Sequence, residues 1–346
     1  MALMTAKSSK RMMRLQEEAS VGSRWSRRAV LGATLSLPFM RTAKADTYPA
    51  RIPHMIVPFP AGGPTDVLAR IAAGQVGPRL GSQIVVENKS GAGGNIAAEF
   101  AARSEPDGYT ILVAGQAILA INKALYNRVT YDAATDFVFI GMLGVIANVL
   151  LVNPNTVPVN SVAELIALAK EKPGEISYGS NGPGSLTHLT TAILAHQAGV
   201  DLLHVPYQGA APLMTDLIAG RIGMTFTAAS AALPLVQSGQ LRALAVTTGT
   251  RSRFSPDIPT LVESGFPTLD APTWFAAVVH AKTPQPIIER LRAEFNAVIT
   301  SHVYAKALEQ QSMEVMAVPP DTADEFLTRE RKLWTDAVKL TGVTLD

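Results

Sequence analysis

The residues best suited to chemistry form a short glycine loop, Pro60-Ala61-Gly62-Gly63-Pro64-Thr65-Asp66. It lies between a run that predicts a strand, residues 52–59, and a periodic stretch that predicts a helix, residues 67–80. Glycines let a ligand approach the backbone closely, and the free N–H groups and dipole of a new helix favour an anion. The loop therefore predicts an anion site, with Thr65 as a hydroxyl donor and Asp66 as a helix cap in preference to a ligand contact.

A second glycine loop has the same setting. Tyr178-Gly179-Ser180-Asn181-Gly182-Pro183-Gly184-Ser185 follows a predicted strand, residues 176–178, and precedes a predicted helix, residues 186–198. In open α/β sheets, ligands bind beyond the carboxyl ends of the strands. Two such loops on two lobes would hold the two sides of one small anion.

Other chemistries have weaker signals. The run Lys89 to Asn95 is rich in glycine but lacks the G-x-G-x-x-G spacing, so we expect no dinucleotide and no other cofactor. No His, Asp or Glu cluster has metal-ligand spacing, and the chain has no cysteine. We therefore expect no metal site.

A serine hydrolase is the catalytic alternative. Ser185 and His188 are three residues apart on one predicted helix, but Tyr178 stands where a G-x-S-x-G elbow needs its first glycine. His188 is better interpreted as a residue that forms structural hydrogen bonds. His204 is better interpreted as a core histidine whose hydrogen bonds are satisfied. A purely structural envelope protein is a further alternative, and the glycine loops argue against it because packing alone does not require them.

The elements that position the loops alternate strand and helix, which predicts α/β lobes with mainly parallel sheets flanked by helices. We predict a two-lobed fold in which residues 46–147 and 272–346 form the first lobe and residues 148–271 the second. A strand at 274–279 would cross back to the first lobe, and C-terminal helices at 286–299 and 323–340 would cover it. Two crossings make a hinge, and a hinge permits closure on a ligand.

The N-terminal segment, residues 1–45, is interpreted as a twin-arginine export signal. Arg27 and Arg28 precede a short apolar run and an Ala43-Lys44-Ala45 cleavage motif. The segment holds nine of the 30 Lys and Arg residues and two of the 28 Asp and Glu residues, so the mature chain carries a net charge of about −5. A protein of this charge lacks the basic footprint of a nucleic-acid binder.

At the loops the sequence resembles the Bug-type solute-binding receptors of the tripartite tricarboxylate transporters. The resemblance covers nearly the whole mature chain, and its motifs are specific when taken together. They are Val57 to Asp66, Val86 to Asn95, Pro106 to Thr110, Asn148 to Pro154, Tyr178 to Ser185 with His188, His204 to Gly209, and Leu241 to Val246.

The resemblance implies a monomeric periplasmic receptor, not an enzyme, that binds a mono- or dicarboxylate, aliphatic or aromatic, through backbone amides, hydroxyls and water. Membrane permease subunits of a tripartite tricarboxylate-type transporter would be its partners. An orphan receptor that signals to a sensor kinase is the alternative within this class. The ligand contacts implied by position are Phe59, Pro60, Ala61, Gly62, Gly63, Thr65, Asp66, Ala114, Gly115, Gln116, Ser180, Gly182, Gly184, Ser185, His188, Tyr207, Thr227 and Ala228.

Two positions depart from the family pattern. Ala61 stands where the family often has proline, and we expect no consequence. Thr227-Ala228 stands where many members have an aspartate-proline pair, so a negative charge near the site is missing. This departure favours a ligand without an ammonium group.

Overall fold

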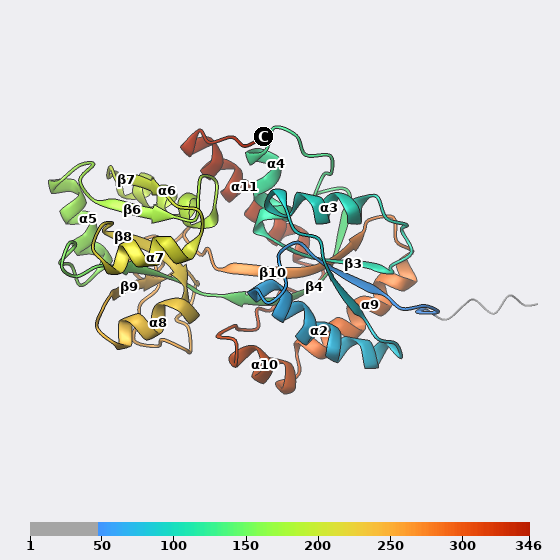
Figure 1. The fold of residues 1–346 in the computed structure, drawn as a ribbon. Coiled ribbons are helices and arrows are strands. Elements are labelled where there is room, and N and C mark those ends of the chain that lie inside the picture. Colours follow the sequence, from blue (N-terminus) through green and yellow to red (C-terminus); the bar gives the residue numbers. More distant parts are fainter. Residues whose placement is uncertain (1–47) are drawn as a thin grey trace, which may run out of the picture. The chain divides into compact units, whose positions relative to one another are not determined.

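The strands of residues 48–346, the part of the chain that the computed structural model describes, form two five-stranded sheets (Figure 1). We call the parts built on these sheets the first and the second lobe. The prediction of a two-lobed α/β fold is confirmed. The predicted export signal lies outside the described residues, and the predicted domain boundaries stay a prediction.

The first sheet has the strand order β2-β1-β3-β10-β4. Strands β1, β2 and β3 run parallel, whereas β10 is antiparallel to both of its neighbours, so the sheet is mixed. The bounds are β1 His54–Val57, β2 Val85–Asn88, β3 Thr110–Gly115, β4 Phe137–Ile146 and β10 Thr273–His280.

Side chains of this sheet alternate between two cores, as the period of two in a strand requires. Met55 and Val57 of β1 enter one core, and Ile56 enters the other. The first core is covered by α2 (Pro64–Leu80), α9 (Gln285–Ile299) and α10 (His302–Glu309). The second core is covered by α3 (Asn95–Ala102) and a π-helical turn, Ala117–Ile121, which leads into α4 (Asn122–Leu125).

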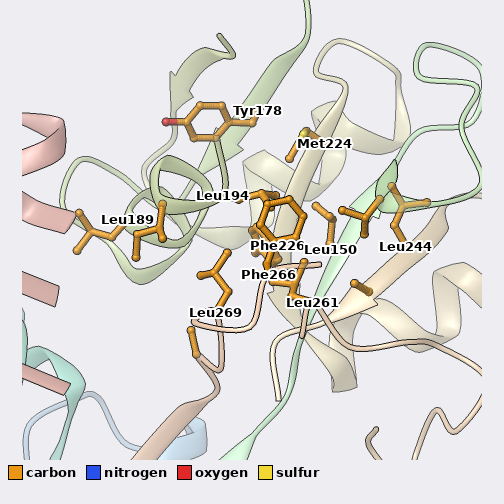
Figure 2. Close-up of a cluster of buried hydrophobic side chains, with 14 of the residues drawn as sticks. Leu150, Tyr178, Leu189, Leu194, Met224, Phe226, Leu244, Leu261, Phe266 and Leu269 are labelled. Atoms are coloured by element: carbon orange, nitrogen blue, oxygen red, sulfur yellow. The ribbon is translucent and has the colours of Figure 1, made fainter. Parts of the chain in front are cut away.

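The second sheet has the order β7-β6-β8-β5-β9 and is mixed in the same way. Its main core gathers Leu150, Phe226, Leu261 and Phe266 (Figure 2). The strands are β5 Asn148–Val152, β6 Ser177–Ser180, β7 Leu203–Pro206, β8 Met224–Ala228 and β9 Arg242–Val246, and the helices are α5 Val162–Glu171, α6 Leu186–Ala198, α7 Ala210–Ile218 and α8 Ala229–Gln237.

The two sheets share one topology. In each lobe the first strand after the chain has crossed, β5 or β10, is the fourth strand of the sheet. It lies next to the strand that leaves the lobe, β4 or β9, and must be antiparallel to it because one strand enters and the other departs. Strands β1 and β6 are therefore equivalent, and so are β3 and β8.

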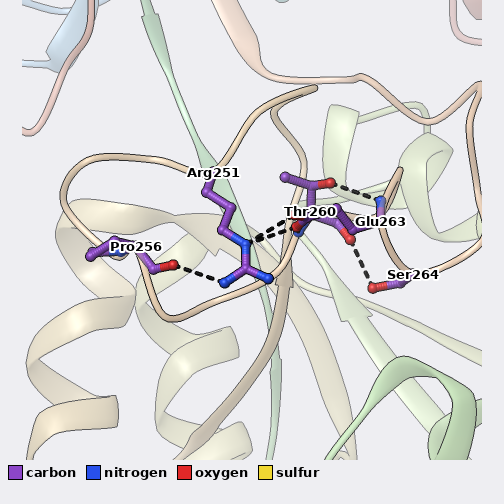
Figure 3. A network of polar contacts seen from close by, with 5 residues as sticks. All are labelled: Arg251, Pro256, Thr260, Glu263 and Ser264. Carbon is purple, nitrogen blue, oxygen red and sulfur yellow. Dashed lines mark hydrogen bonds and ion pairs between the residues drawn. The ribbon is translucent and has the colours of Figure 1, made fainter.

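The chain passes between the lobes at Ala147 and again through residues 247–272. A polar network braces this second segment: Arg251 binds the carboxylate of Glu263, which accepts the amide of Thr260 at 2.8 Å (Figure 3). Asn148 Nδ2 donates to Thr273 Oγ1 at 3.0 Å and so ties the two crossings together.

The sequence predicts that the C-terminal helix covers the first lobe, but α11 (Ala323–Thr341) packs on both lobes. Phe326 packs into a first-lobe core, while Trp334 packs into the main core of the second lobe. Between them Glu330, 4% exposed, accepts a hydrogen bond from Trp334 Nε1 at 3.1 Å and one from Trp274 Nε1 of β10 at 2.8 Å. Burial raises the pKa of this carboxyl group.

Removing the Glu330 carboxyl group should destabilise the fold through the two indoles. Glu330→Ala leaves both N–H groups buried without an acceptor, which should cost about 3 kcal/mol of unfolding free energy. Glu330→Gln keeps an acceptor and removes a charge that burial disfavours, so it should stay within about 1 kcal/mol of the wild type. Urea unfolding of both variants checks this, and equal stabilities would show that the indole bonds do not matter.

Candidate functional site

The first-lobe loop joins β1 to α2. The first intrahelical bond runs from Val67 N–H to the carbonyl of Gly63 at 3.0 Å. The amides of Thr65 and Asp66 therefore precede the helical ladder and have no acceptor within it. Pro60, Ala61 and Gly62 are exposed above this helix end, and Gly62 has a φ of +82°, which favours glycine.

The Asp66 carboxylate fixes the first-lobe loop through hydrogen bonds. One carboxylate oxygen, Oδ2, accepts the amide of Gly62 at 2.9 Å and Nε of Arg70 at 3.0 Å. The other accepts Asn88 Nδ2 at 3.0 Å, and Asn88 also donates to the carbonyl of Phe59. The hydrogen bond from Arg70 is the largest cause that lowers the pKa of Asp66 to about 2. Both oxygens are occupied, which agrees with a capping role.

The third glycine run packs beside this loop. A Cβ on Gly94 would lie 3.2 Å from Pro58 and 3.0 Å from Ile118, so a side chain there would crowd both. Asn122 of α4 donates to the carbonyl of Gly93 and to Asn95 Oδ1. These contacts give the run a structural role between the first loop and the π-helical turn.

At the end of β3 lie Ala114, Gly115 and Gln116. The Gln116 side chain donates to the carbonyl of Pro272 and accepts the amide of Trp274 at 3.0 Å. Its amide group is thus engaged with the returning chain, so its position favours a structural role. Gly115 is required because a Cβ would lie 2.6 Å from the carbonyl oxygen of Trp274.

The second-lobe loop joins β6 to α6. Ser185 is the N-cap: its Oγ accepts the amide of His188 at 3.4 Å and donates to the carbonyl of Gly182 at 2.6 Å. Ser180, fully buried, donates to the same carbonyl and accepts the amide of Gly182, both at 3.2 Å. The loop is therefore held by its own hydroxyl groups.

Two histidines lie beneath this loop. His188 Nδ1 accepts the amide of Gly184 at 3.1 Å, and His204 Nε2 is 2.7 Å from Ser180 Oγ. The two imidazole rings stack with centroids 4.0 Å apart, and Tyr178 stacks on His204 at 4.9 Å. The contact of His204 with Ser180 depends on the pairing of β7 with β6, which no pattern in the sequence indicates.

The remaining predicted residues lie at neighbouring strand ends. Tyr207 follows β7, its amide donates to the carbonyl of Ser180, and its hydroxyl donates to Asp216 at 2.9 Å. Thr227 and Ala228 end β8, where Ala228 packs against a core of the first lobe. Because β6 and β8 are parallel, as β1 and β3 are, both loops of a lobe meet at one edge of its sheet.

Leu125, the last residue of α4, lies against the second-lobe loop, and Tyr126, which follows α4, lies against the third glycine run. A Cβ on Gly184 would lie 2.6 Å from Leu125, and one on Gly93 would lie 2.5 Å from the Tyr126 hydroxyl. Within residues 48–346 no hydrogen bond joins the Phe59–Asp66 loop directly to the Ser180–Ser185 loop. A surface hollow of about 740 Å³ lies at the far end of α2, near Pro78 and Ile84, and contains none of the predicted contacts.

The geometry of the serines does not support nucleophilic catalysis. Ser185 Oγ bonds to backbone groups and Thr187, and His188 Nδ1 accepts Gly184 N–H, so the two side chains form no nucleophile–base pair. Ser180 does contact His204, but Ser180 is fully buried. Among residues 48–346 no cluster of acidic or histidine side chains suits a metal ion, and no helix is both long and apolar enough to cross a bilayer.

Replacing Asp66 by Asn should weaken the fold at neutral pH. The charge-assisted bonds to Gly62 and Arg70 would be lost, which should cost about 2 kcal/mol. Because the folded pKa is depressed to about 2, the contribution of Asp66 is present above its ordinary pKa of 3.8 and disappears as pH falls toward 2.

The difference in unfolding free energy between wild type and Asp66→Asn should therefore shrink below pH 4. Urea titrations from pH 7 to pH 2 measure it. Asp336→Asn, which removes an exposed pair with Lys332, is the control and should leave the unfolding free energy nearly unchanged. A gap that does not change with pH would refute this role of Asp66.

The comparison with known proteins agrees with the motifs. Residues 68–343 match the model of the tripartite tricarboxylate transporter family receptor. Protein BugT of Bordetella pertussis is 37% identical over 302 residues, which cover 87% of this chain and 92% of BugT.

Two solved structures are similar over most of the chain. R. palustris Rpa4515 with adipate is 34% identical, with a TM-score of 0.72, and covers 86% of this chain and 99% of its own. MatC from Rhodopseudomonas palustris with bound malate is 26% identical, with a TM-score of 0.68, and covers 84% and 100%. The resemblance is confirmed: the chain belongs to the tripartite tricarboxylate transporter receptor family, whose members are solute-binding receptors and not enzymes.

Proposed function

We propose that this chain is a monomeric periplasmic receptor that binds a small mono- or dicarboxylate between its two lobes and delivers it to a tripartite tricarboxylate-type permease. One observation carries the proposal. Equivalent strands of the two lobes, β1 and β6, each end in a glycine loop that opens a helix. Export through the twin-arginine signal would place the receptor in the periplasm.

The ligands of the relatives support the carboxylate class. Adipate in Rpa4515 and malate in MatC are both small dicarboxylates. Helix N-termini favour such anions because their free amides and the helix dipole both stabilise negative charge. The proposed contacts are the Phe59–Asp66 and Ser180–Ser185 loops and the ends of β3 and β8.

Neutral donors suffice for binding. The cation beside the first loop, Arg70, is bonded to Asp66, so it is already paired. Each hydrogen bond to a charged group contributes roughly 1.5–3 kcal/mol. Four or five of them reach the ~8 kcal/mol of a micromolar complex after ordering costs.

The end of β8 favours a ligand without an ammonium group. Thr227 and Ala228 are neutral and close the sheet edge where β6 and its loop also end. A buried ammonium group requires a partner of opposite charge. We therefore propose organic acids and not amino acids as ligands.

Thermal denaturation with a panel of solutes tests the proposal. At least one compound among the aliphatic dicarboxylates, including adipate and malate, and the aromatic acids should raise the melting temperature. A ligand at 100 times its Kd adds about 2.7 kcal/mol to the free energy of unfolding. Amino acids, sugars and cations serve as controls. Stabilisation by the controls alone would overturn the carboxylate assignment.

A bulky residue in the first loop should block binding without unfolding the protein. Gly63 has an ordinary φ of −75°, and an added Cβ meets only the Pro60 carbonyl oxygen, at 3.4 Å. Gly63→Leu should therefore fold but raise the Kd of the best acid at least tenfold by calorimetry. Gly74→Leu is the matched control, since Gly74 lies on the same helix with nothing within 4 Å of an added Cβ. Equal Kd values for the two variants would exclude the loop as a contact.

A further inference from the structure

The two stacked histidines under the second-lobe loop each form a hydrogen bond with it. His188, on the first turn of α6, is buried and bonds the amide of Gly184; His204, on β7, is half-buried and bonds Ser180. Their rings are nearly parallel, with an interplanar angle of 7°. The Gly182–Ser185 loop is thus held from beneath by two imidazoles.

The hydrogen bond from the Gly184 amide defines the protonation of the His188 ring. His188 Nδ1 accepts a hydrogen bond from Gly184 N–H, so it must carry a lone pair, and His188 is neutral with its own proton on Nε2. His204 Nε2 lies 2.7 Å from Ser180 Oγ, a contact that either tautomer of His204 can form, with the ring or the hydroxyl as the donor. A proton added to His188 Nδ1 would remove the acceptor of Gly184.

The surroundings keep the rings neutral. Burial, reinforced by His204, lowers the pKa of His188 to about 4, and burial also lowers the pKa of His204. Tyr178, stacked on His204, stays neutral because burial raises its pKa to about 12.

Several ionisable groups on the neighbouring elements bond to other residues. On α4, Lys123 faces Asp132; on α11, Glu330 binds two indoles. On α7, Asp216 binds Tyr207 and Arg221. Burial is the main cause that lowers the pKa of His188, and His204 adds to it because a charge on that ring would repel a second one.

We propose that neutral His188, stacked on His204, positions the Gly182–Ser185 loop for the ligand, and that a proton on His188 Nδ1 frees Gly184 and weakens the site. This inference rests on the proposed function, because it takes the loop as a ligand contact. The inference predicts a distinctive direction for the change in affinity with pH. An imidazolium that simply attracted the anion would tighten binding in acid, whereas loss of the loop acceptor loosens it.

Nitrogen-15 NMR of the ligand-free protein tests the positioning without any ligand. The His188 ring should be the Nε2–H tautomer at pH 7, and its titration should share one midpoint, well below 6.5, with the amide shift of Gly184. A His188 titration midpoint near the ordinary value of 6.5, or a Gly184 amide shift that does not follow the titration of the ring, would overturn the inference. Because no ligand is used, this result is independent of the proposed function.

Binding of adipate and malate to variants tests the consequence. His188→Asn places an amide oxygen near the position of Nδ1 and cannot titrate, so its Kd at pH 7 should stay within about threefold of the wild type. His188→Leu lacks the acceptor and should bind at least tenfold more weakly. His196→Leu, on the exposed last turn of the same helix, is the control and should bind like the wild type.

The pH profile separates positioning from general structural damage. With a His188 pKa of about 4, the ratio of the wild-type Kd to that of His188→Asn should rise about twofold between pH 7 and pH 4. Protonation of the ligand cancels in this ratio. A constant or falling ratio would contradict the proposal, and absence of binding by every acid would overturn the proposed function while the NMR result still decides the role of His188.

Discussion

The first amides of α2 and α6, which have no acceptor within their own helices, are the feature on which the rest of this structure depends. The glycine loop before each helix is fixed by side chains that form hydrogen bonds with its backbone. In the first lobe Asp66 does this with Arg70 and Asn88. In the second lobe Ser180, Ser185 and the histidine pair do it. The first lobe thus holds its loop with a charged pair, and the second lobe holds the equivalent loop with neutral side chains.

The junction between the lobes follows from the same topology. In each sheet the fourth strand comes directly after a crossing between the lobes. The point at which the chain enters a lobe therefore sets where the second and third strands of its sheet end, β1 and β3 in the first lobe and β6 and β8 in the second. Gln116 fixes the returning chain at the end of β3, and Glu330 joins β10 to α11. Helix α11 reaches cores of both lobes, so movement of one lobe against the other would have to be accommodated by this helix.

The sequence predicted much of this because the loops and the elements around them are local signals. Helix α6 has the predicted bounds, and the family resemblance is confirmed. Strand β4 was missed because its ten residues, Phe137 to Ile146, are apolar on both faces and include glycines, so they show no alternation. Helix α8 was missed because Pro234 interrupts its pattern. The bond between Asp66 and Asn88 and the partners of Gln116 and His204 depend on strands brought together by folding, and no spacing in the sequence encodes them.

A crystal structure of the protein with a carboxylate that stabilises it would test the central claim most directly. The account predicts carboxylate oxygens within hydrogen-bond distance, about 3 Å, of backbone amides in both the Phe59–Asp66 and the Ser180–Ser185 loops, with Arg70 still bonded to Asp66. A ligand held by an arginine or lysine side chain, or bound to one lobe away from these loops, would contradict it.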